Sequence, residues 1–331
     1  MHGKAAGSVD MNGSRILFVA VIALCPALCA AAQLLVLSKG QASLAFVDPV
    51  TGKTAGTVPT GDGPHEVEVS SDGRLAFVSN YGAQSPGSSL SVIDIPGRKE
   101  LKRVDLGELR RPHGLAFSGG HLYFTSELSQ KVGRYDPAGQ RVDWTFDTKQ
   151  EGTHMVLASH DGKKLFTSNI GSNSVGMIAR GAGDEWRQSL ISVGKGPEGL
   201  DLSPDGRELW SAHSRDGGIS VIDAANGKVV HTIDARTQRS NRVKFTRDGK
   251  HVLVSDVSGG EVVILDAAKR AEIKRLPVGK TPTGILIPPE GGIAYVAVSG
   301  DNRLAVIDLK TLTVARSIET AENPDGMAWV K

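Results

Sequence analysis

Cysteine is almost absent from this chain of 331 residues. Its two cysteines, Cys25 and Cys29, both lie in an apolar N-terminal stretch, and none follows. Cleavage of that stretch would leave a protein that cannot form disulfides and that depends on packing alone. The sequence also lacks a G-x-S-x-G elbow, a Walker loop and a C-x-x-C-H haem attachment motif. The enzyme classes that these motifs mark are therefore not indicated.

The chain also lacks an excess of charge of one sign. It has 38 basic and 36 acidic residues, a net charge of +2, and only 5% aromatic residues. A general nucleic-acid binder would show a basic excess or stripe, so no nucleic-acid partner is expected. Beyond residue 32 no apolar run is long enough to cross a membrane as a helix.

Residues 1–32 have the order of a cleavable signal peptide. A short basic start that ends at Arg15 precedes the apolar run 16–28, and Ala30, Ala31 and Ala32 supply the small residues before a cleavage site. Met11 is an alternative start. A lipid anchor at Cys25 or Cys29 is the other interpretation, although a leucine precedes each cysteine. We expect a periplasmic or secreted protein whose mature domain comprises residues 33–331.

A unit of roughly 43 residues recurs seven times in the rest of the chain. Its clearest mark is a short segment such as Pro64-His65-Glu66-Val67, which returns in variant form at 112–115, 153–156, 197–200, 240–243, 282–285 and 324–327. Repeats of about 40–45 residues with four short strands are typical of β-propeller blades. The predicted fold is therefore all-β, a single seven-bladed propeller of four-stranded antiparallel blades.

Each unit contains four short apolar stretches separated by turn residues. In one unit we expect strands at 199–202, 208–212, 218–223 and 229–234, with Asp205-Gly206 as a hairpin turn. Six units end their third strand in aspartate, which we interpret as a turn former. The last unit stops after one strand, 327–330, while the mature chain begins with three, at 34–37, 44–47 and 55–58. Together these predict a last blade closed by one C-terminal and three N-terminal strands.

Short sequences within the repeats resemble those of a known family. Phe77-Val78-Ser79-Asn80, Phe166-Thr167-Ser168-Asn169 and Tyr295-Val296-Ala297-Val298 look like variants of the repeat that names the YVTN family. The chain thus resembles an exported, YncE-like seven-bladed propeller over essentially its whole mature length. The resemblance implies the fold and leaves the activity open, since relatives include surface proteins, lactonase-like enzymes and subunits of periplasmic oxidoreductases.

Function in a repeat protein is expected where the copies differ. The first strand of each blade leaves one face and the second returns to it, so the start of one and the end of the other share that face. The candidate ligand-binding residues on this face are His65, His113, His154, Glu127, Glu198, His213, Asn241 and Arg242.

Three of these histidines, His65, His113 and His154, occupy the same position in consecutive blades. Neutral imidazoles are good ligands for Zn, Cu, Ni or Fe, and we take these three as candidate ligands of a divalent metal ion. Glu127 or Glu198 could then supply a carboxylate or a base. The structural alternative is that each histidine bonds a neighbouring loop and joins blade to blade. The sequence does not decide between them.

Three functions follow, and whether the chain is an enzyme stays open. The first is a propeller, expected to be monomeric, that binds a small molecule or a periplasmic protein partner at this histidine-rich face. The second is a metal-assisted hydrolase or lyase, lactonase-like, that uses the three histidines. The third is an accessory subunit of a periplasmic redox system.

Overall fold

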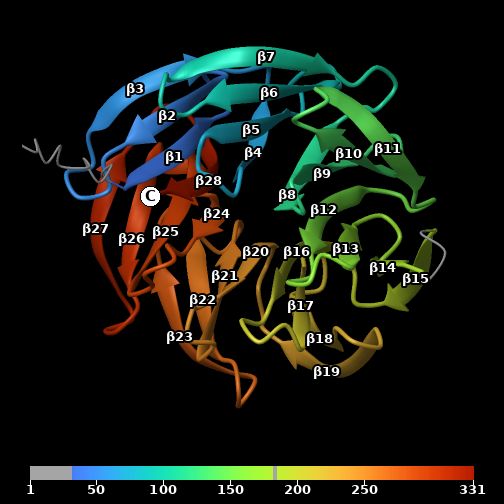
Figure 1. Cartoon of the computed structure of the whole chain (residues 1–331). Helices are drawn as coiled ribbons and strands as arrows, with labels where there is room; N and C mark the ends of the chain where they lie inside the picture. The colour runs from blue at the N-terminus through green and yellow to red at the C-terminus, as the bar shows by residue number, and fades with distance from the viewer. Residues whose placement is uncertain (1–31, 182–184) are drawn as a thin grey trace, which may run out of the picture. The chain divides into compact units, whose positions relative to one another are not determined.

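The computed structural model describes residues 32–181 and 185–331. Apart from residue 32, the predicted signal peptide lies outside the described residues. Seven four-stranded antiparallel sheets surround a central axis (Figure 1), which confirms the predicted fold class. Their innermost strands follow one another around the axis in the order β28, β4, β8, β12, β16, β20 and β24. Among the described residues, no helix has the length and apolarity that a membrane crossing requires.

The strands of each blade run from the axis to the rim in the order a, b, c, d. The a strands are β4 (Pro64–Val69), β8 (Pro112–Ser118), β12 (Thr153–Ala158), β16 (Pro197–Leu202), β20 (Ser240–Phe245), β24 (Pro282–Leu286) and β28 (Pro324–Val330). The b strands are β1 (Gln33–Ser38), β5 (Leu75–Asn80), β9 (His121–Ser126), β13 (Lys164–Asn169), β17 (Glu208–His213), β21 (His251–Asp256) and β25 (Ile293–Val298).

The two outer sets complete the blades. The c strands are β2 (Ser43–Val47), β6 (Ser89–Asp94), β10 (Lys131–Asp136), β14 (Ser174–Arg180), β18 (Gly218–Asp223), β22 (Glu261–Asp266) and β26 (Arg303–Asp308). The d strands are β3 (Thr54–Pro59), β7 (Lys99–Asp105), β11 (Arg141–Asp147), β15 (Trp186–Ser192), β19 (Lys228–Asp234), β23 (Ala271–Pro277) and β27 (Thr313–Glu319). A short 3-10 turn, η1 (Ser299–Asp301), follows β25.

The turn residues act as the sequence predicts. In the a–b hairpins Gly73, Gly162, Gly206 and Gly249 have φ near +70°, a conformation that glycine adopts without strain. At the ends of the c strands, aspartate carboxylates accept backbone N–H groups, as Asp48 does from Val50 at 2.8 Å and Asp223 does from Ala225 at 2.8 Å. These aspartates are turn formers.

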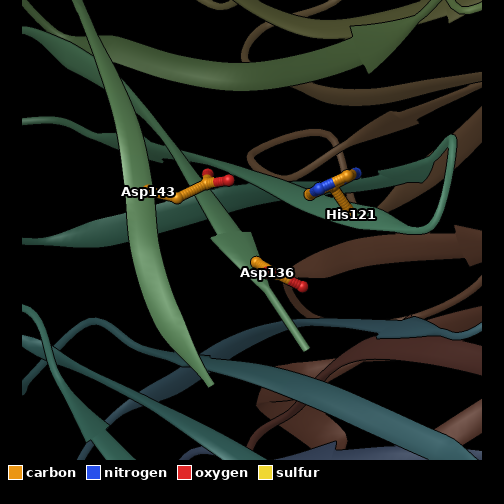
Figure 2. A group of neighbouring side chains, drawn as sticks. All are labelled: His121, Asp136 and Asp143. Carbon is orange, nitrogen blue, oxygen red and sulfur yellow. The ribbon is translucent and has the colours of Figure 1, made fainter. Parts of the chain in front are cut away.

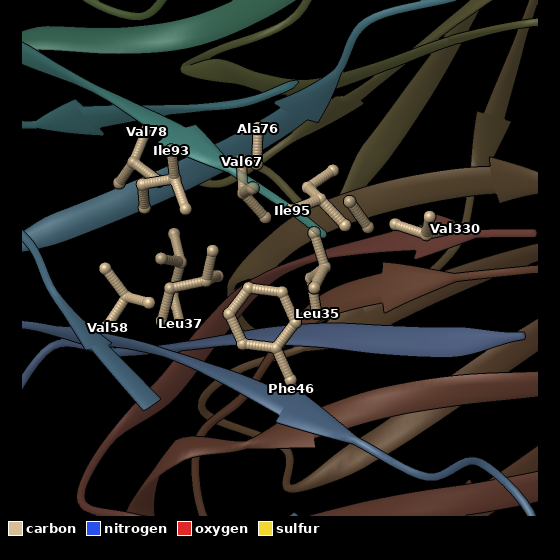
Figure 3. Close-up of a cluster of buried hydrophobic side chains, with 12 residues drawn as sticks. Leu35, Leu37, Phe46, Val58, Val67, Ala76, Val78, Ile93, Ile95 and Val330 are labelled. Atoms are coloured by element: carbon tan, nitrogen blue, oxygen red, sulfur yellow. The ribbon is translucent and has the colours of Figure 1, made fainter. Parts of the chain in front are cut away.

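The core is divided among the spaces between neighbouring blades. Figure 3 shows one such cluster, in which Leu35 and Phe46 of one blade face Val67 and Val78 of the next, with Val330 beside them. These side chains are 7% exposed or less. Each sheet therefore buries both of its faces against its neighbours, so the blades are stable only as a ring.

The ring closes as predicted. Strand β28 pairs antiparallel with β1, so that Trp329 lies opposite Leu34 and Met327 opposite Val36, and the sheet order is β28-β1-β2-β3. The C-terminal strand thus covers the edge that β1 would otherwise expose. Two segments nearly 300 residues apart in the chain form one blade.

Buried hydroxyl groups on three b strands link their blades to the next. Thr125 accepts the Gly114 N–H of its own blade at 2.8 Å and donates to the carbonyl of His154 in the next at 2.5 Å. The same pair of bonds is made by Ser168, with Met155 N–H and Glu198 O, and by Ser255, with Arg242 N–H and Thr283 O. We call Thr125, Ser168 and Ser255 the bridging hydroxyls.

Removal of residues 327–331 should lower the free energy of unfolding by at least about 3 kcal/mol, because it strips the buried edge of β1 and its apolar partners. Urea denaturation of the truncated protein measures the loss. Removal of Lys331 alone, which lies outside β28, is the control and should change little. Equal stability of the two truncations would contradict the closure.

Substitution of Thr125 by Val should lower the free energy of unfolding by about 2–4 kcal/mol, because the shape is kept while two buried backbone groups lose their partner. Ser211 is the matched control. It is buried, yet its hydroxyl has no hydrogen-bond partner among the described residues, so Ser211→Ala should cost less than about 1 kcal/mol. Similar losses in the two variants would show that the bridging bonds contribute nothing.

Candidate functional site

One end of the central channel opens into a cavity of about 600 Å³, the funnel cavity. The second residue of every a strand lines it, and we call these seven residues the inner ring: His65, His113, His154, Glu198, Asn241, Thr283 and Asp325. The sequence placed all seven on one face, and the structure brings them together around one space. The wall also includes three residues that directly follow b strands: Lys39, Tyr81 and Glu127.

The three predicted histidines are in contact. The ring centroids of His113 and His154 are 3.7 Å apart with a tilt of 32°, and those of His65 and His113 are 4.9 Å apart. His113 and His154 are 2% and 7% exposed, while the side chain of His65 keeps 23% of its surface exposed. The predicted convergence of these rings is therefore present in the fold.

Two of the histidines are oriented by carboxylates from the preceding blade. The Nδ1 atom of His154 is 3.0 Å from Glu127 Oε2, and that of His65 is 3.2 Å from Asp325 Oδ2. Because each pair joins neighbouring blades, these histidines do contribute to blade-to-blade contact. The bonds also fix the ring orientation and leave Nε2 of His154 without a hydrogen-bond partner among the described residues.

The pKa values of two groups at this histidine row both shift downward, for different reasons. Burial, together with the nearby imidazoles of His154 and His65, holds the pKa of His113 well below its usual value, so His113 is neutral at pH 7. Burial would raise the pKa of Asp325, yet Lys39, 3.1 Å away, and His65 hold it below its usual range. Asp325 is therefore an ionised, fully compensated carboxylate.

The floor of the funnel cavity is an ion pair that crosses the channel. The guanidinium of Arg242 on β20 donates to the carboxylate of Glu66 on β4. These strands are separated by β24 and β28 on one side and by β8, β12 and β16 on the other. Burial disfavours the charge on Arg242, but Glu66, Asp325 and Glu198 hold its pKa above the ordinary value. In the wall above, Asn241 donates to Glu198.

Tyr81, which lines the cavity, and Arg111 beside it are among the residues here that were not predicted as ligands. The Tyr81 hydroxyl donates to Glu127 Oε1 at 3.1 Å, and its ring centroid is 4.6 Å from that of His65. The guanidinium of Arg111 lies 4.5 Å from the centre of the Tyr81 ring. The sequence signal that could have identified Tyr81 was its position, because it directly follows a b strand that ends on the predicted face.

The structure places one candidate residue elsewhere. His213 does not line the funnel cavity, although it was predicted to share its face. It is 1% exposed, and its Nδ1 atom is 3.1 Å from Asp216 Oδ1 in the following turn. The end of a b strand lies farther from the axis than the start of an a strand, so its side chain turns into the loop between blades. Asn169 and Asp256 do the same.

The geometry gives the metal hypothesis mixed support. Imidazole nitrogens bind metals in the plane of the ring, and the nearly stacked rings of His113 and His154 direct their lone pairs side by side. In residues 32–181 and 185–331, the group whose ligand atoms all lie within 4.8 Å of one another is His121, Asp136 and Asp143 (Figure 2). The carboxylate of Asp143 already accepts hydrogen bonds from Nε and Nη2 of Arg134, at 2.8 and 3.0 Å. This cationic partner disfavours a bound metal cation.

Residues 149–288 match the model of the cytochrome D1 heme domain family. The chain is similar to the hydrazine synthase subunit beta of Kuenenia stuttgartiensis, with 33% identity over 173 residues, 44% of this chain and 45% of that protein. It is 22% identical to YncE of Salmonella typhimurium over 52% of this chain and 50% of YncE. The chain thus spans half the length, or less, of these curated relatives.

Solved structures share the fold. A Kuenenia stuttgartiensis hydrazine synthase chain superposes with a TM-score of 0.74 at 22% identity, covering 83% of this chain and 92% of that one. A candidate 6-phosphogluconolactonase from Bacteroides uniformis superposes with a TM-score of 0.76 at 16% identity, covering 90% and 99%. At these identities the likeness concerns the fold alone.

Proposed function

We propose that this chain, a YVTN-like seven-bladed β-propeller related to YncE and to the hydrazine synthase beta subunit, binds a small anionic molecule in its funnel cavity. The observation that carries the proposal is a 600 Å³ cavity on the axis, lined by all seven members of the inner ring. The volume lies in the range of small-molecule sites, and the wall has many polar groups in fixed positions.

The charge of the wall selects the ligand class. Four cations line the cavity, and two of them are already paired, Lys39 with Asp325 and Arg242 with Glu66. Arg215 and Arg239 are exposed and make no ion pair among the described residues. Guanidinium groups bind carboxylates and phosphates through two parallel hydrogen bonds. We infer that Arg215 and Arg239 supply these bonds to the ligand.

The histidine row would then form the wall opposite a charged group of the ligand. His113 is neutral, so it can donate or accept one hydrogen bond without the desolvation cost of a charge. Lys39 and His65 hold Asp325 so that its negative charge is compensated before the ligand enters. Among the described residues, Arg215 and Arg239 thus offer the ligand two cations that make no ion pair, beside the carboxylates of Glu127 and Glu198 that also line the cavity.

Replacement of Arg215 and Arg239 together by Gln should weaken the binding of citrate about 10- to 100-fold, measured by calorimetry, because two charge-assisted contacts are lost. Arg207→Gln is the control, because it removes the same charge from a side chain that is 85% exposed in an a–b hairpin turn and does not line this cavity. Binding of neither citrate nor inorganic phosphate would contradict the proposal, as would an equal effect of Arg207→Gln.

The second candidate is metal-assisted catalysis at the histidine row. The observation that favours it is the pairing of His154 with Glu127 and of His65 with Asp325, because histidines that bind metals usually hydrogen-bond a carboxylate through their other nitrogen. These residues would hold a divalent ion after rotation of the His113 ring. The ion would supply Lewis-acid chemistry for hydrolysis.

On this alternative, protein purified without a histidine tag and incubated with Zn, Cu, Mn or Ca should retain about one ion per chain. Elemental analysis should find none in the His113→Ala/His154→Ala double variant. His231→Ala, at an exposed position on β19, is the control and should keep the ion. A wild-type protein that retains no metal after incubation would count against the alternative.

A further inference from the structure

A second cavity, of about 300 Å³, lies in the same channel, and we call it the axial chamber. Arg242 lines both cavities, and its partner Glu66 lines the axial chamber. The ion pair that crosses the channel therefore separates the two spaces. Apart from Arg242, the two cavities share no lining residue among those that the structure describes.

The walls of the axial chamber are mostly apolar. Five a strands contribute aliphatic or thioether side chains: Leu115, Met155, Leu157, Leu200, Ile285 and Met327. The indole of Trp329 completes this surface. The titratable groups come from β4, β20 and the turn that follows β20. Because these two strands are not neighbours in the ring, the charged side chains lie among the apolar ones.

Most of the charged groups in the chamber have charged or carbonyl partners. Glu66 pairs with Arg242, and Lys244 lies 3.1 Å from Asp201. Arg247 donates to the backbone carbonyls of Ile287, at 2.7 Å, and Pro288.

Glu68 also lines the chamber. Its carboxyl makes no ion pair and no hydrogen bond to another side chain among the described residues; the backbone N–H of Val69 and the charges of Lys244 and Glu66 act on it, but it has no counter-charge within ion-pair distance. Glu68 is the carboxyl left for a ligand.

We propose that the axial chamber binds a primary amine with a compact apolar body, whose ammonium group pairs with the carboxylate of Glu68. An ammonium group would supply the missing partner, and the body would lie against the leucine and methionine side chains. A neutral ligand would leave the carboxyl without a counter-charge. A carboxylate ligand would face both Glu66 and Glu68.

The protonation of Glu68 gives this site a pH signature. Burial and the nearby Glu66 carboxylate raise the pKa of Glu68 to about 7, against the opposing effect of Lys244. In the pH range around this pKa, the neighbouring charged groups keep their own partners. Arg242 pairs with Glu66, Asp201 pairs with Lys244, and Arg247 donates to the Ile287 carbonyl. Amine binding requires the ionised carboxylate, so binding below this pKa must first remove a proton. Affinity should therefore fall on acidification and level off above about pH 7.

The test is calorimetric titration of the full chain with cyclohexylamine, with cyclohexanol and cyclohexanecarboxylate as the neutral and anionic probes of similar shape. We expect one amine per chain and an affinity that falls about tenfold per pH unit below pH 7. Glu68→Gln should weaken amine binding at least about tenfold and remove the pH dependence. The substitution keeps the shape of the side chain, and its fold is checked by circular dichroism.

Glu290→Gln is the matched control, since it removes an exposed carboxylate next to Pro289 at the edge of the chamber. It should leave amine binding unchanged. Three results would overturn the proposal: no amine binding at about 10 mM, equal or tighter binding of the alcohol or the carboxylate, or equal effects of the two Glu→Gln variants. Citrate binding in the funnel cavity is measured separately, so failure of one proposal does not decide the other.

Discussion

The bridging hydroxyls are the constraint on which the site depends. Each one accepts a backbone N–H from its own a strand and donates to the inner-ring carbonyl of the following blade, so it fixes the spacing and rotation of two neighbouring inner strands at once. The side chains of His154, Glu198 and Thr283 project from backbone held in this way. Rings such as those of His113 and His154 can therefore approach within 3.7 Å without any direct hydrogen bond between them.

On this common backbone, differences among the repeats produce the chemistry. Three consecutive copies carry His at the inner-ring position, and the other four carry Glu, Asn, Thr or Asp. Each inner-ring carboxylate is satisfied by a neighbour: Asp325 by His65 and Lys39, and Glu198 by Asn241. Charge is thus balanced locally inside the ring, while unpaired cations remain at the mouth. The channel is polar without carrying a large uncompensated buried charge.

The fold could be predicted because its signals are local and repeated. Turn pairs such as Asp205-Gly206 and the aspartates after the c strands act within a few residues, and the split blade follows from strand counts at the two ends. The inner ring could be predicted for the same reason, since equivalent positions share a face. Ser168 occupies the same position of the repeat as Thr125 and Ser255, so the sequence shows a serine or threonine there. It does not show the bridging bonds, because a polar residue in a strand has many possible partners.

Other parts of the site depend on distances across the ring, which the repeat does not encode. The pairing of Glu66 with Arg242 joins residues 176 positions apart, and only the ring geometry brings them together. His213, a candidate ligand residue, lies outside the lining of the funnel cavity for a related reason: sharing a face does not imply the same distance from the axis.

An odd number of blades has a further consequence. In a seven-membered ring no strand has an exact opposite, so any chord between two of them divides the circle unequally. The chord from β4 to β20 leaves β24 and β28 on its minor arc, and His113, His154 and Glu198 all belong to strands of the major arc. The odd number of blades thus makes the two sides of the funnel unequal in size, and two of the three histidines of the row lie on the larger side.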